Sequence, residues 1–515
     1  MTNFSYPKHV ERWNVFECSC RGKEDGNPFT DYTIQGVFTS KNEETAVDGF
    51  YNGDGEYRVR FMPSFAESYR FEIHGSFSDT VYRGDFEATT ANDNNHGPVR
   101  VANTFHFAYE DGAPYYPVGT TCYVWELQSD ALQRQTLETL KNSPFNKIRF
   151  CIFPKHYDYN LKEPYSYPYI GKPMDNSVLT KENFLQYMCG MKGGVPPDND
   201  WDFKRFNVQH FQHIEKRIED LRDLGIEADL IVMHPYDRWG FSMMDAECDD
   251  LYWNYVIARF AAYRNVWWAL ANEYDLMPQK TIRDWERYAA ILREKDPYKH
   301  LRSIHNCRPF YDHSRPWITH CSIQRQDIYK CAELVDEYRE QYKKPIVLDE
   351  IAYEGNIQHG WGNISGRELV RRFWEAALRG GYASHGETFT HPDDLLWWSH
   401  GGELRGESPA RLAFLRRVLS ETPGSGLAPT QGSWDETTAT VEQTTGDSGY
   451  YLFYYGFMRP SFRDFYFDEE NEYHVEIIDT WNMTIEDRGY CKGKFRVKLP
   501  GKEYMAIRIR RRENG

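Results

Sequence analysis

The chain lacks the features that mark exported, membrane-spanning and nucleic-acid-binding proteins. Residues 1–7 contain no basic segment followed by an apolar one, so the sequence predicts no signal peptide. No run of about 18 apolar residues occurs, which is the length that a membrane-spanning helix needs. The formal net charge of −16 would repel nucleic acid. We therefore expect a cytoplasmic protein with neither a membrane nor a nucleic-acid partner.

Cysteine pairs of the kind that bind metal are missing as well. The ten cysteines are scattered singly apart from Cys18 and Cys20, and no Cys-x-x-Cys spacing occurs. A disulfide framework is not expected at this density in 515 residues. We expect reduced thiols, no bound metal and no cofactor, and the sequence leaves the oligomeric state open.

Aromatic residues, by contrast, are abundant: they make up 16% of the chain, with 37 Tyr and 15 Trp. Large hydrophobic cores would account for them, and so would flat rings that stack on sugars, and composition alone does not choose. A chain of 515 residues exceeds one hydrophobic core, so about two to four domains are expected.

Both ends of the chain have the pattern of β-strands. Short segments that alternate apolar and polar residues, separated by turn signals such as Gly53 and Gly55, predict an immunoglobulin-like β-sandwich over residues 1–92. Residues 91–98 have the composition of a linker. Alternation returns beyond Gly426 and predicts a second, small β-sandwich over residues 427–515.

Residues 99–422 instead alternate between strands and helices, which predicts a (β/α)8 (TIM) barrel. A doubly wound sheet would require a glycine-rich phosphate turn after the first strand, and the residues after Gly119 do not supply one. A long aromatic insertion, 156–201, predicts a functional or disordered loop. The expected strands are 116–123, 147–153, 227–234, 266–271, 302–305, 317–320, 345–350 and 383–387.

Two carboxylates stand at predicted strand ends: Glu273 after strand four and Glu350 at the end of strand seven. Active sites of such barrels lie at this end. Two facing carboxyl groups can divide the acid and nucleophile roles of glycoside hydrolysis, and a separation of about 5–5.5 Å leads to retention of configuration. Asn272 is placed to bind a sugar hydroxyl, and Arg149 on strand two requires a carboxylate partner, for which Glu350 is the candidate.

Further polar and aromatic residues are predicted at the same rim. Glu387 is a third carboxylate, at the end of strand eight. Trp397 and Trp398 either form a stacking platform or cap the barrel. A histidine ends each of strands three, five, six and eight, and such residues are singly more often structural than functional. Together they also suggest a metal site, although no metal-binding histidine spacing accompanies them. These histidines are His234, His305, His320 and His385.

Arg149, Asn272-Glu273 and Glu350 on strands two, four and seven resemble the clan A retaining glycoside hydrolases, of which glycoside hydrolase family 5 is the most similar group. Residues 47–61 resemble the β-sandwich domain that precedes such barrels in bacterial glycosidases, and residues 206–218 resemble their second barrel helix. The C-terminal β-domain is similar to their tail domain.

The resemblance implies that Glu273 is the acid/base, that Glu350 is the nucleophile and that Arg149 orients Glu350. It also implies that Asn272, His234 and His320 contact the substrate or the nucleophile. One departure is that family 5 members commonly carry His-x-Tyr on strand six, whereas His320 is followed here by Cys-Ser-Ile.

The sequence thus predicts a cytoplasmic retaining β-glycosidase that acts on short oligosaccharides or glycosides, with the insertion 156–201 favouring exo action. Two alternatives stay open. One is a non-catalytic carbohydrate-binding protein on a degenerate barrel, and the other is a metal-dependent barrel hydrolase that uses the rim histidines. The sugar, the linkage and the choice between pyranosides and furanosides are not predicted.

Overall fold

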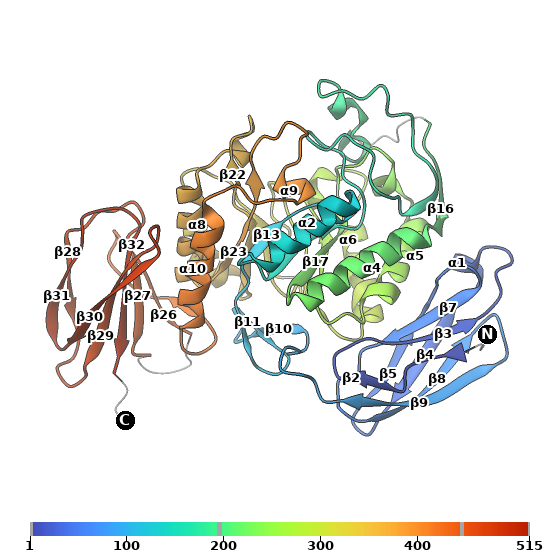
Figure 1. Cartoon of the computed structure of the whole chain (residues 1–515), viewed down its shortest axis with the longest axis horizontal. Helices are drawn as coiled ribbons and strands as arrows, with labels where there is room; N and C mark the ends of the chain where they lie inside the picture. The colour runs from blue at the N-terminus through green and yellow to red at the C-terminus, as the bar shows by residue number, and fades with distance from the viewer. Residues whose placement is uncertain (1–3, 193–197, 443–447, 513–515) are drawn as a thin grey trace.

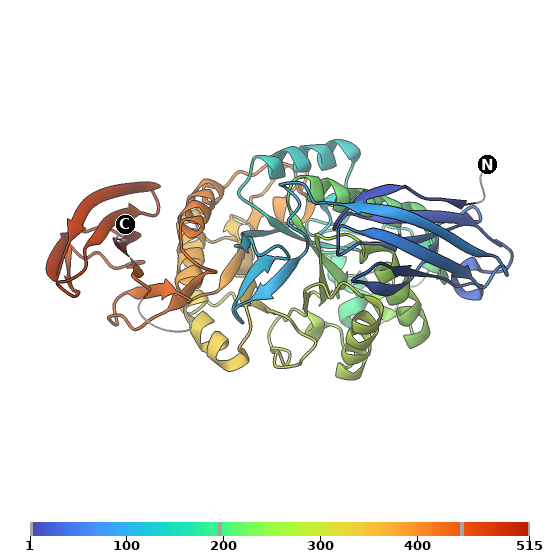
Figure 2. The same cartoon turned by 90° about the horizontal axis from the view of Figure 1, so that it is seen from below.

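A computed structural model describes residues 4–192, 198–442 and 448–512. The chain forms a central barrel with a β-rich region at each end of its long axis, as both views show (Figures 1 and 2). The multidomain organisation around a barrel is therefore confirmed. Within the described ranges no helix is long and apolar enough to cross a membrane.

The N-terminal region consists of two antiparallel-rich sheets with strand orders β1-β3-β7-β6 and β2-β9-β8-β4-β5. Their facing sides are aromatic: Phe16 stacks on Phe86 with ring centroids 4.1 Å apart, and Phe38 on Phe61 at 4.3 Å. Alternation in the sequence produces this arrangement because successive side chains of a strand point to opposite faces. The strands are β1 (Phe4–Ser5), β2 (His9–Glu11), β3 (Phe16–Arg21), β4 (Ile34–Thr39), β5 (Glu44–Asp48), β6 (Phe50–Tyr51), β7 (Glu56–Phe61), β8 (Ser68–Gly75) and β9 (Val81–Thr89).

Eight parallel strands form the barrel in the order β19-β18-β17-β14-β13-β23-β21-β20. The ladder is open between β19 and β20, where the Thr319 N–H donates to the Arg302 carbonyl at 2.9 Å. The strands are largely buried, as expected for a parallel sheet covered by helices. They are β13 (Gly119–Thr121), β14 (Lys147–Cys151), β17 (Glu227–Met233), β18 (Val266–Ala271), β19 (Arg302–Ser303), β20 (Cys321–Gln324), β21 (Ile346–Glu350) and β23 (Tyr382–His385).

Helices surround the barrel and bury one face against it (Figures 1 and 2). Local signals set several of their starts: the Ser129 hydroxyl accepts from the Leu132 N–H, and Ser365 accepts from Glu368 in the same way. Gly225, with a positive φ, follows one helix. The main helices are α2 (Asp130–Lys141), α4 (Val208–Asp223), α5 (Ala246–Phe260), α6 (Ile282–Lys295), α7 (Val335–Tyr342), α8 (Gly366–Leu378) and α10 (Ser408–Ser420).

The sixth strand differs from the prediction. It is β20, Cys321–Gln324, and not residues 317–320, which form a turn before it. His320 therefore precedes the strand and lies at the opposite end of the barrel from the strand tips. There its ring contacts Trp267 and Phe107, with centroids 5.2 and 5.8 Å away. The expectation that His320 lies at the rim was wrong.

Three small sheets complete the barrel, one of them the pair β22 (Glu354–Gly355) and β24 (Glu387–Thr388). Another, absent from the prediction, is β10 (Val99–Ala102), β11 (His106–Tyr109) and β12 (Pro114–Tyr115), and Phe107 of this sheet covers Trp267 at the barrel base. The insertion after strand two carries the antiparallel pair β15 (Tyr169–Lys172) and β16 (Asp200–Phe206), a short η2 (Phe184–Tyr187) and α3 (Cys189–Lys192). It is thus a structured loop, apart from residues 193–197, which lie outside the described residues.

Both terminal regions pack on the barrel through polar as well as apolar contacts. Glu215 of α4 lies between Arg60 of β7 and Arg259 of α5, at 2.7 and 2.6 Å, and all three side chains are buried. At the other end Trp374 of α8 stacks on Tyr454. The C-terminal strands are β25 (Leu427–Pro429), β26 (Thr437–Val441), β27 (Tyr450–Tyr454), β29 (Tyr473–Asp479), β30 (Thr484–Cys491) and β32 (Met505–Arg511), with β28 (Phe462–Tyr466) pairing separately with β31 (Lys494–Lys498).

Candidate active site

A pocket of about 650 Å³ lies at the mouth of the barrel, where the carboxyl ends of the strands meet. Every one of the eight barrel strands, or the loop that follows it, contributes a side chain. In strand order from β13 to β23, these are Tyr123, Lys155, Tyr236, Glu273, Cys307, Gln324, Glu350 and Trp398.

Glu273 follows β18 in the left-handed backbone conformation, with φ of 51°. This conformation is uncommon for a residue with a side chain, and here it turns the chain sharply as the strand ends. The Glu273 carboxyl is 4% exposed and accepts hydrogen bonds from the Tyr236 hydroxyl and, at 3.2 Å, from the Asn272 amide. Burial and then the nearby Glu350 charge raise the pKa of Glu273.

Glu350 ends β21 and is 5% exposed. The Tyr123 hydroxyl donates to its Oε1, His305 Nε2 lies 3.4 Å from the same oxygen, and an Arg149 nitrogen lies at 3.8 Å. Burial opposes ionisation of Glu350. Its contacts with His305, then the Arg149 charge and the Tyr123 hydroxyl, outweigh burial and lower the pKa of Glu350.

The side chain of Gln324 lies between the two carboxyl groups. With its amide nitrogen facing them, Gln324 donates to Glu273 Oε1 at 3.1 Å and to Glu350 Oε2 at 3.2 Å. These two oxygens can therefore be no farther apart than the two distances added together. The two carboxyl groups therefore face each other across the Gln324 amide.

Beneath the pocket, buried charges from three strands compensate one another. Lys147 contacts Asp349 at 2.8 Å and Asp229 at 2.7 Å, and Arg149 lies 3.5 Å from Asp229. Ser322 links this group to the pocket, because its hydroxyl donates to Asp349 at 2.6 Å and lies 3.0 Å from Nδ1 of His305. The network fixes the His305 ring beside Glu350.

The pocket contains a buried cation, Lys155, which was not predicted from the sequence. Its ammonium lies 3.4, 4.2 and 4.4 Å from the ring centroids of Tyr123, Tyr236 and Trp398. No hydrogen bond or ion pair to this ammonium occurs among the described residues. Burial lowers the pKa of Lys155, because a charged ammonium among rings and without a hydrogen-bond acceptor is poorly solvated.

The structure brings together most of the predicted site residues. Glu273, Glu350 and Trp398 line the pocket, and Asn272, Arg149 and His305 lie directly behind the two carboxylates. Trp398 contacts Trp361 with ring centroids 5.1 Å apart, and both rings line the pocket wall.

Four predicted residues lie elsewhere. His320 is at the barrel base, and His234 is buried behind the pocket, with Nε2 3.2 Å from the Phe153 carbonyl. Trp397 points away from the pocket and donates to the Thr120 hydroxyl at 2.8 Å. Glu387 accepts the N–H groups of Arg405 and Gly406. None of these four lines the pocket.

The residues that sequence reasoning missed are Tyr123, Lys155, Tyr236, Gln324 and Tyr353. Each lies at a strand end or within about three residues of one, a position at which polar and aromatic residues often belong to the site of a barrel. Tyr123 is of particular interest because it supplies from strand one the tyrosine contact to Glu350 that strand six lacks.

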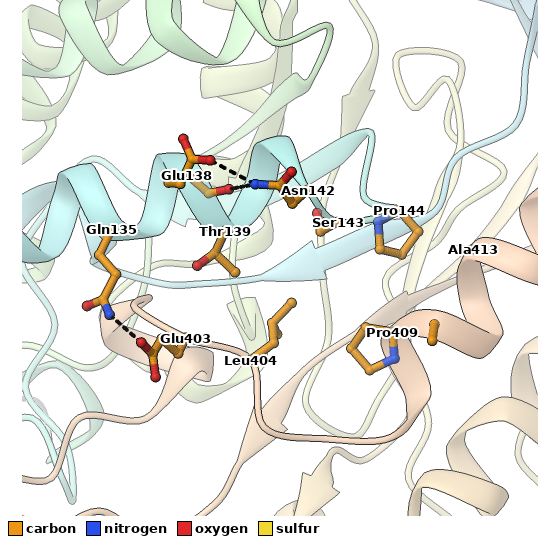
Figure 3. A pocket seen from close by; sticks show the side chains of 11 residues that line it. Gln135, Glu138, Thr139, Asn142, Ser143, Pro144, Glu403, Leu404, Pro409 and Ala413 are labelled. Atoms are coloured by element: carbon orange, nitrogen blue, oxygen red, sulfur yellow. Dashed lines mark hydrogen bonds between the residues drawn. The ribbon is translucent and has the colours of Figure 1, made fainter.

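A second hollow, of about 730 Å³, lies on the outside of the barrel between α2 and α10 (Figure 3). Its carboxylates, Glu138 and Glu403, are exposed and hydrogen-bonded to Asn142 and Gln135. No barrel strand end reaches it, so it lacks the facing, buried carboxyl pair of the mouth pocket.

Comparisons with protein-family models and solved structures also place a catalytic domain over the barrel residues. Residues 102–440 match the family model described as "Apiosidase-like, catalytic domain". Residues 9–76 and 434–510 match two domains of unknown function, DUF5060 and DUF5605. A comparison with curated proteins gives no match.

Two solved structures are similar over most of the chain. A crystal structure of a proposed glycoside hydrolase from Bacteroides vulgatus ATCC 8482 has 34% sequence identity and a TM-score of 0.89, and the match covers 98% of this chain and all of that one. A structure described as a glycoside hydrolase has 13% identity and a TM-score of 0.59, covers 82% of this chain and 98% of its own, and supports the fold alone. By its match over the whole barrel, the chain belongs to the family with an apiosidase-like catalytic domain.

Proposed function

We propose that the protein is a retaining β-glycosidase that hydrolyses short oligosaccharides or glycosides, with Glu350 as nucleophile and Glu273 as acid/base. The observation that carries this proposal is the buried pair itself: two carboxyl groups face each other across Gln324, and their surroundings shift their pKa values in opposite directions. Such a division is what double displacement requires of its acid and its nucleophile.

In the first step Glu350 attacks the anomeric carbon and forms a glycosyl ester, while Glu273 gives its proton to the departing oxygen. The His305, Arg149 and Tyr123 contacts support this assignment because they keep Glu350 ionised. Burial supports the other role, because it favours the protonated form of Glu273.

In the second step Glu273, now ionised, accepts a proton from water, and the water attacks the anomeric carbon and releases Glu350. Asn272, held by Arg149 at 3.3 Å and bonded to Glu273, is positioned to bind the hydroxyl beside that carbon. A contact there strengthens as positive charge develops in the transition state.

The pocket supports a small substrate. Its volume of about 650 Å³ lies in the range of small-molecule sites, and Tyr157 and Met191 of the 156–201 insertion form part of its wall. We infer that the insertion closes one end of the site and favours exo action. We further propose that the enzyme is soluble and cytoplasmic. We also propose three domains, 1–92, 99–422 and 427–515, with a β-sandwich at each end.

The test is a panel of nitrophenyl pyranosides and furanosides, including an apioside because of the family's name, with the anomer of the first-formed product identified by NMR. Retention is the expected outcome. An inverted product would refute the assigned mechanism, and binding without turnover across the panel would favour a carbohydrate-binding protein instead.

The two carboxylates can be separated by substitution. Glu350→Ala is expected to abolish turnover. Glu273→Ala should keep more activity on substrates with good leaving groups, and azide should restore part of the rest, because azide needs no general base. Full activity in both variants would show that the pair is not catalytic, and circular dichroism checks that each variant is folded.

A further inference from the structure

Three potential metal ligands meet away from the pocket, on the side of strand eight that faces α10. Glu354 of β22 (Glu354–Gly355) and Glu387 of β24 (Glu387–Thr388) are direct partners in a parallel strand pair, and His385 precedes Glu387 by two residues. One oxygen of each carboxylate and a ring nitrogen of His385 all lie within 4.8 Å of one another. All three residues are at most 3% exposed.

Cationic side chains balance the two carboxylates only weakly, because the Arg405 charge acts on Glu387 from beyond ion-pair distance. Glu354 accepts the N–H groups of Glu407 and Ser408, and Glu387 those of Arg405 and Gly406. The backbone at the start of α10 and in the turn before it thus supplies partial positive charge only. No ion pair to either carboxylate occurs in the described part of the chain. Two buried carboxylates directly opposite each other in a strand pair repel, so the pair requires either a shared proton or a bound cation.

His385 favours the cation. Its Nδ1 lies 3.0 Å from the Thr120 hydroxyl oxygen, which also accepts from the Trp397 indole at 2.8 Å, whereas its Nε2 has no hydrogen-bond partner and the ring is fully buried. Nε2 is therefore a buried nitrogen without a hydrogen-bond partner, in a ring that belongs to this cluster, which is unfavourable unless a bound ligand satisfies it.

We propose that Glu354, His385 and Glu387 form a structural site for a divalent transition-series cation, with zinc the best match. One imidazole and two carboxylates are ligands that zinc accepts, whereas calcium and magnesium prefer oxygen alone. Zinc lies about 2.0–2.2 Å from such ligands, so it would draw the three donor atoms slightly closer together. Each carboxylate oxygen has a second lone pair with which it keeps its backbone N–H contact.

The ion would join three segments: the loop after strand seven, the end of strand eight and the chain that enters α10. Figure 3 shows the last of these from outside, where the ribbon runs from Leu404 to Pro409. In the sequence, Tyr353 directly precedes Glu354, and Trp398 lies between Glu387 and the segment that enters α10. Tyr353 and Trp398 both line the mouth pocket. The site therefore supports one pocket wall, and it stands independently of the proposed glycosidase activity.

The test begins with the full chain purified without metal-affinity chromatography, dialysed against zinc and then against metal-free buffer, with bound metals measured by inductively coupled plasma mass spectrometry. We expect about one equivalent of metal in the wild type and nearly none in Glu387→Gln and His385→Gln. Glu126→Gln is the matched control, because Glu126 is equally buried but has no hydrogen-bond partner on either oxygen; it should keep the metal.

Thermal unfolding with and without EDTA gives a second readout. Chelation should lower the Tm of the wild type to the Tm of Glu387→Gln and leave that variant unchanged. A shared proton makes the opposite prediction: no metal in the wild type, no effect of EDTA, and an unchanged or higher Tm in Glu387→Gln. That result, or equal metal content in the wild type and both variants, would overturn the proposal.

Discussion

Removal of single tyrosine hydroxyls should move the two limbs of the pH–activity profile separately. Tyr123 donates its hydroxyl hydrogen to Glu350, and Tyr236 donates to Glu273. Each hydrogen bond stabilises the ionised carboxylate and lowers its pKa. The proposed mechanism needs Glu350 ionised and Glu273 protonated, so in it Glu350 sets the acid limb of kcat/KM and Glu273 the alkaline limb.

A hydrogen bond to a charged group contributes about 1.5–3 kcal/mol, and about 1.4 kcal/mol corresponds to one pKa unit. Because Arg149 and His305 still contact Glu350 in Tyr123→Phe, we expect the lower end of this range. The acid limb should rise by about one pH unit with the alkaline limb unchanged, which narrows the profile. Tyr236→Phe should raise the alkaline limb by a similar amount and widen the profile.

Both variants keep the aromatic ring beside Lys155, so packing and the cation contact are matched. The assay is kcat/KM over a pH range on a glycoside that the wild type hydrolyses. If Tyr123→Phe moved the alkaline limb alone, the roles of Glu273 and Glu350 would be reversed. If neither variant moved a limb, these carboxylates would not be the groups whose ionisation controls the reaction.

Four further outcomes follow from contacts described above. Glu215→Gln leaves Arg60 and Arg259 without their shared carboxylate, so unfolding should become easier by about 3–5 kcal/mol, measured by denaturant titration, with kcat/KM unchanged where the variant is folded. Lys155→Met should raise KM about tenfold or more, because the Lys155 cation lacks a protein acceptor and is available to the substrate. The methionine side chain fills similar space, so the shape of the pocket is kept. An unchanged KM would show that Lys155 does not bind the substrate. His320→Asn should leave kcat/KM within about twofold, because its ring lies at the barrel base, whereas His305→Asn should raise the acid limb.

Much of the site could be predicted because each of the two strands ends where an apolar run in the sequence gives way to polar residues. The apolar run 266–271 ends directly at Asn272 and Glu273, and the apolar run 346–348 is followed by Asp349 and Glu350, so counting strands was enough to place the pair across one barrel mouth. Arg149 was found by the same logic, since a cation within a buried strand requires a partner.

Strand six was missed for a physical reason. Its residues include Ser322, which bridges His305 and Asp349, and Gln324, which lies between the catalytic candidates. These polar residues point inward, so the true strand lacked an apolar pattern, whereas Trp317 and Ile318 in the preceding turn supplied one. The position of Lys155 could not be predicted either, because its ring contacts come from three other segments of the chain.

The charged layer below the pocket has a consequence for how the barrel opens. Lys147 and Arg149 of β14, Asp229 of β17 and Asp349 of β21 form a set of two positive and two negative charges with almost no exposure. If any one of these three strands left the barrel, a buried charge would remain in the interior without its partner. Partial opening at the mouth is therefore costly in this layer, and loops above it can rearrange around a sugar while the three strands stay together as one cooperative unit.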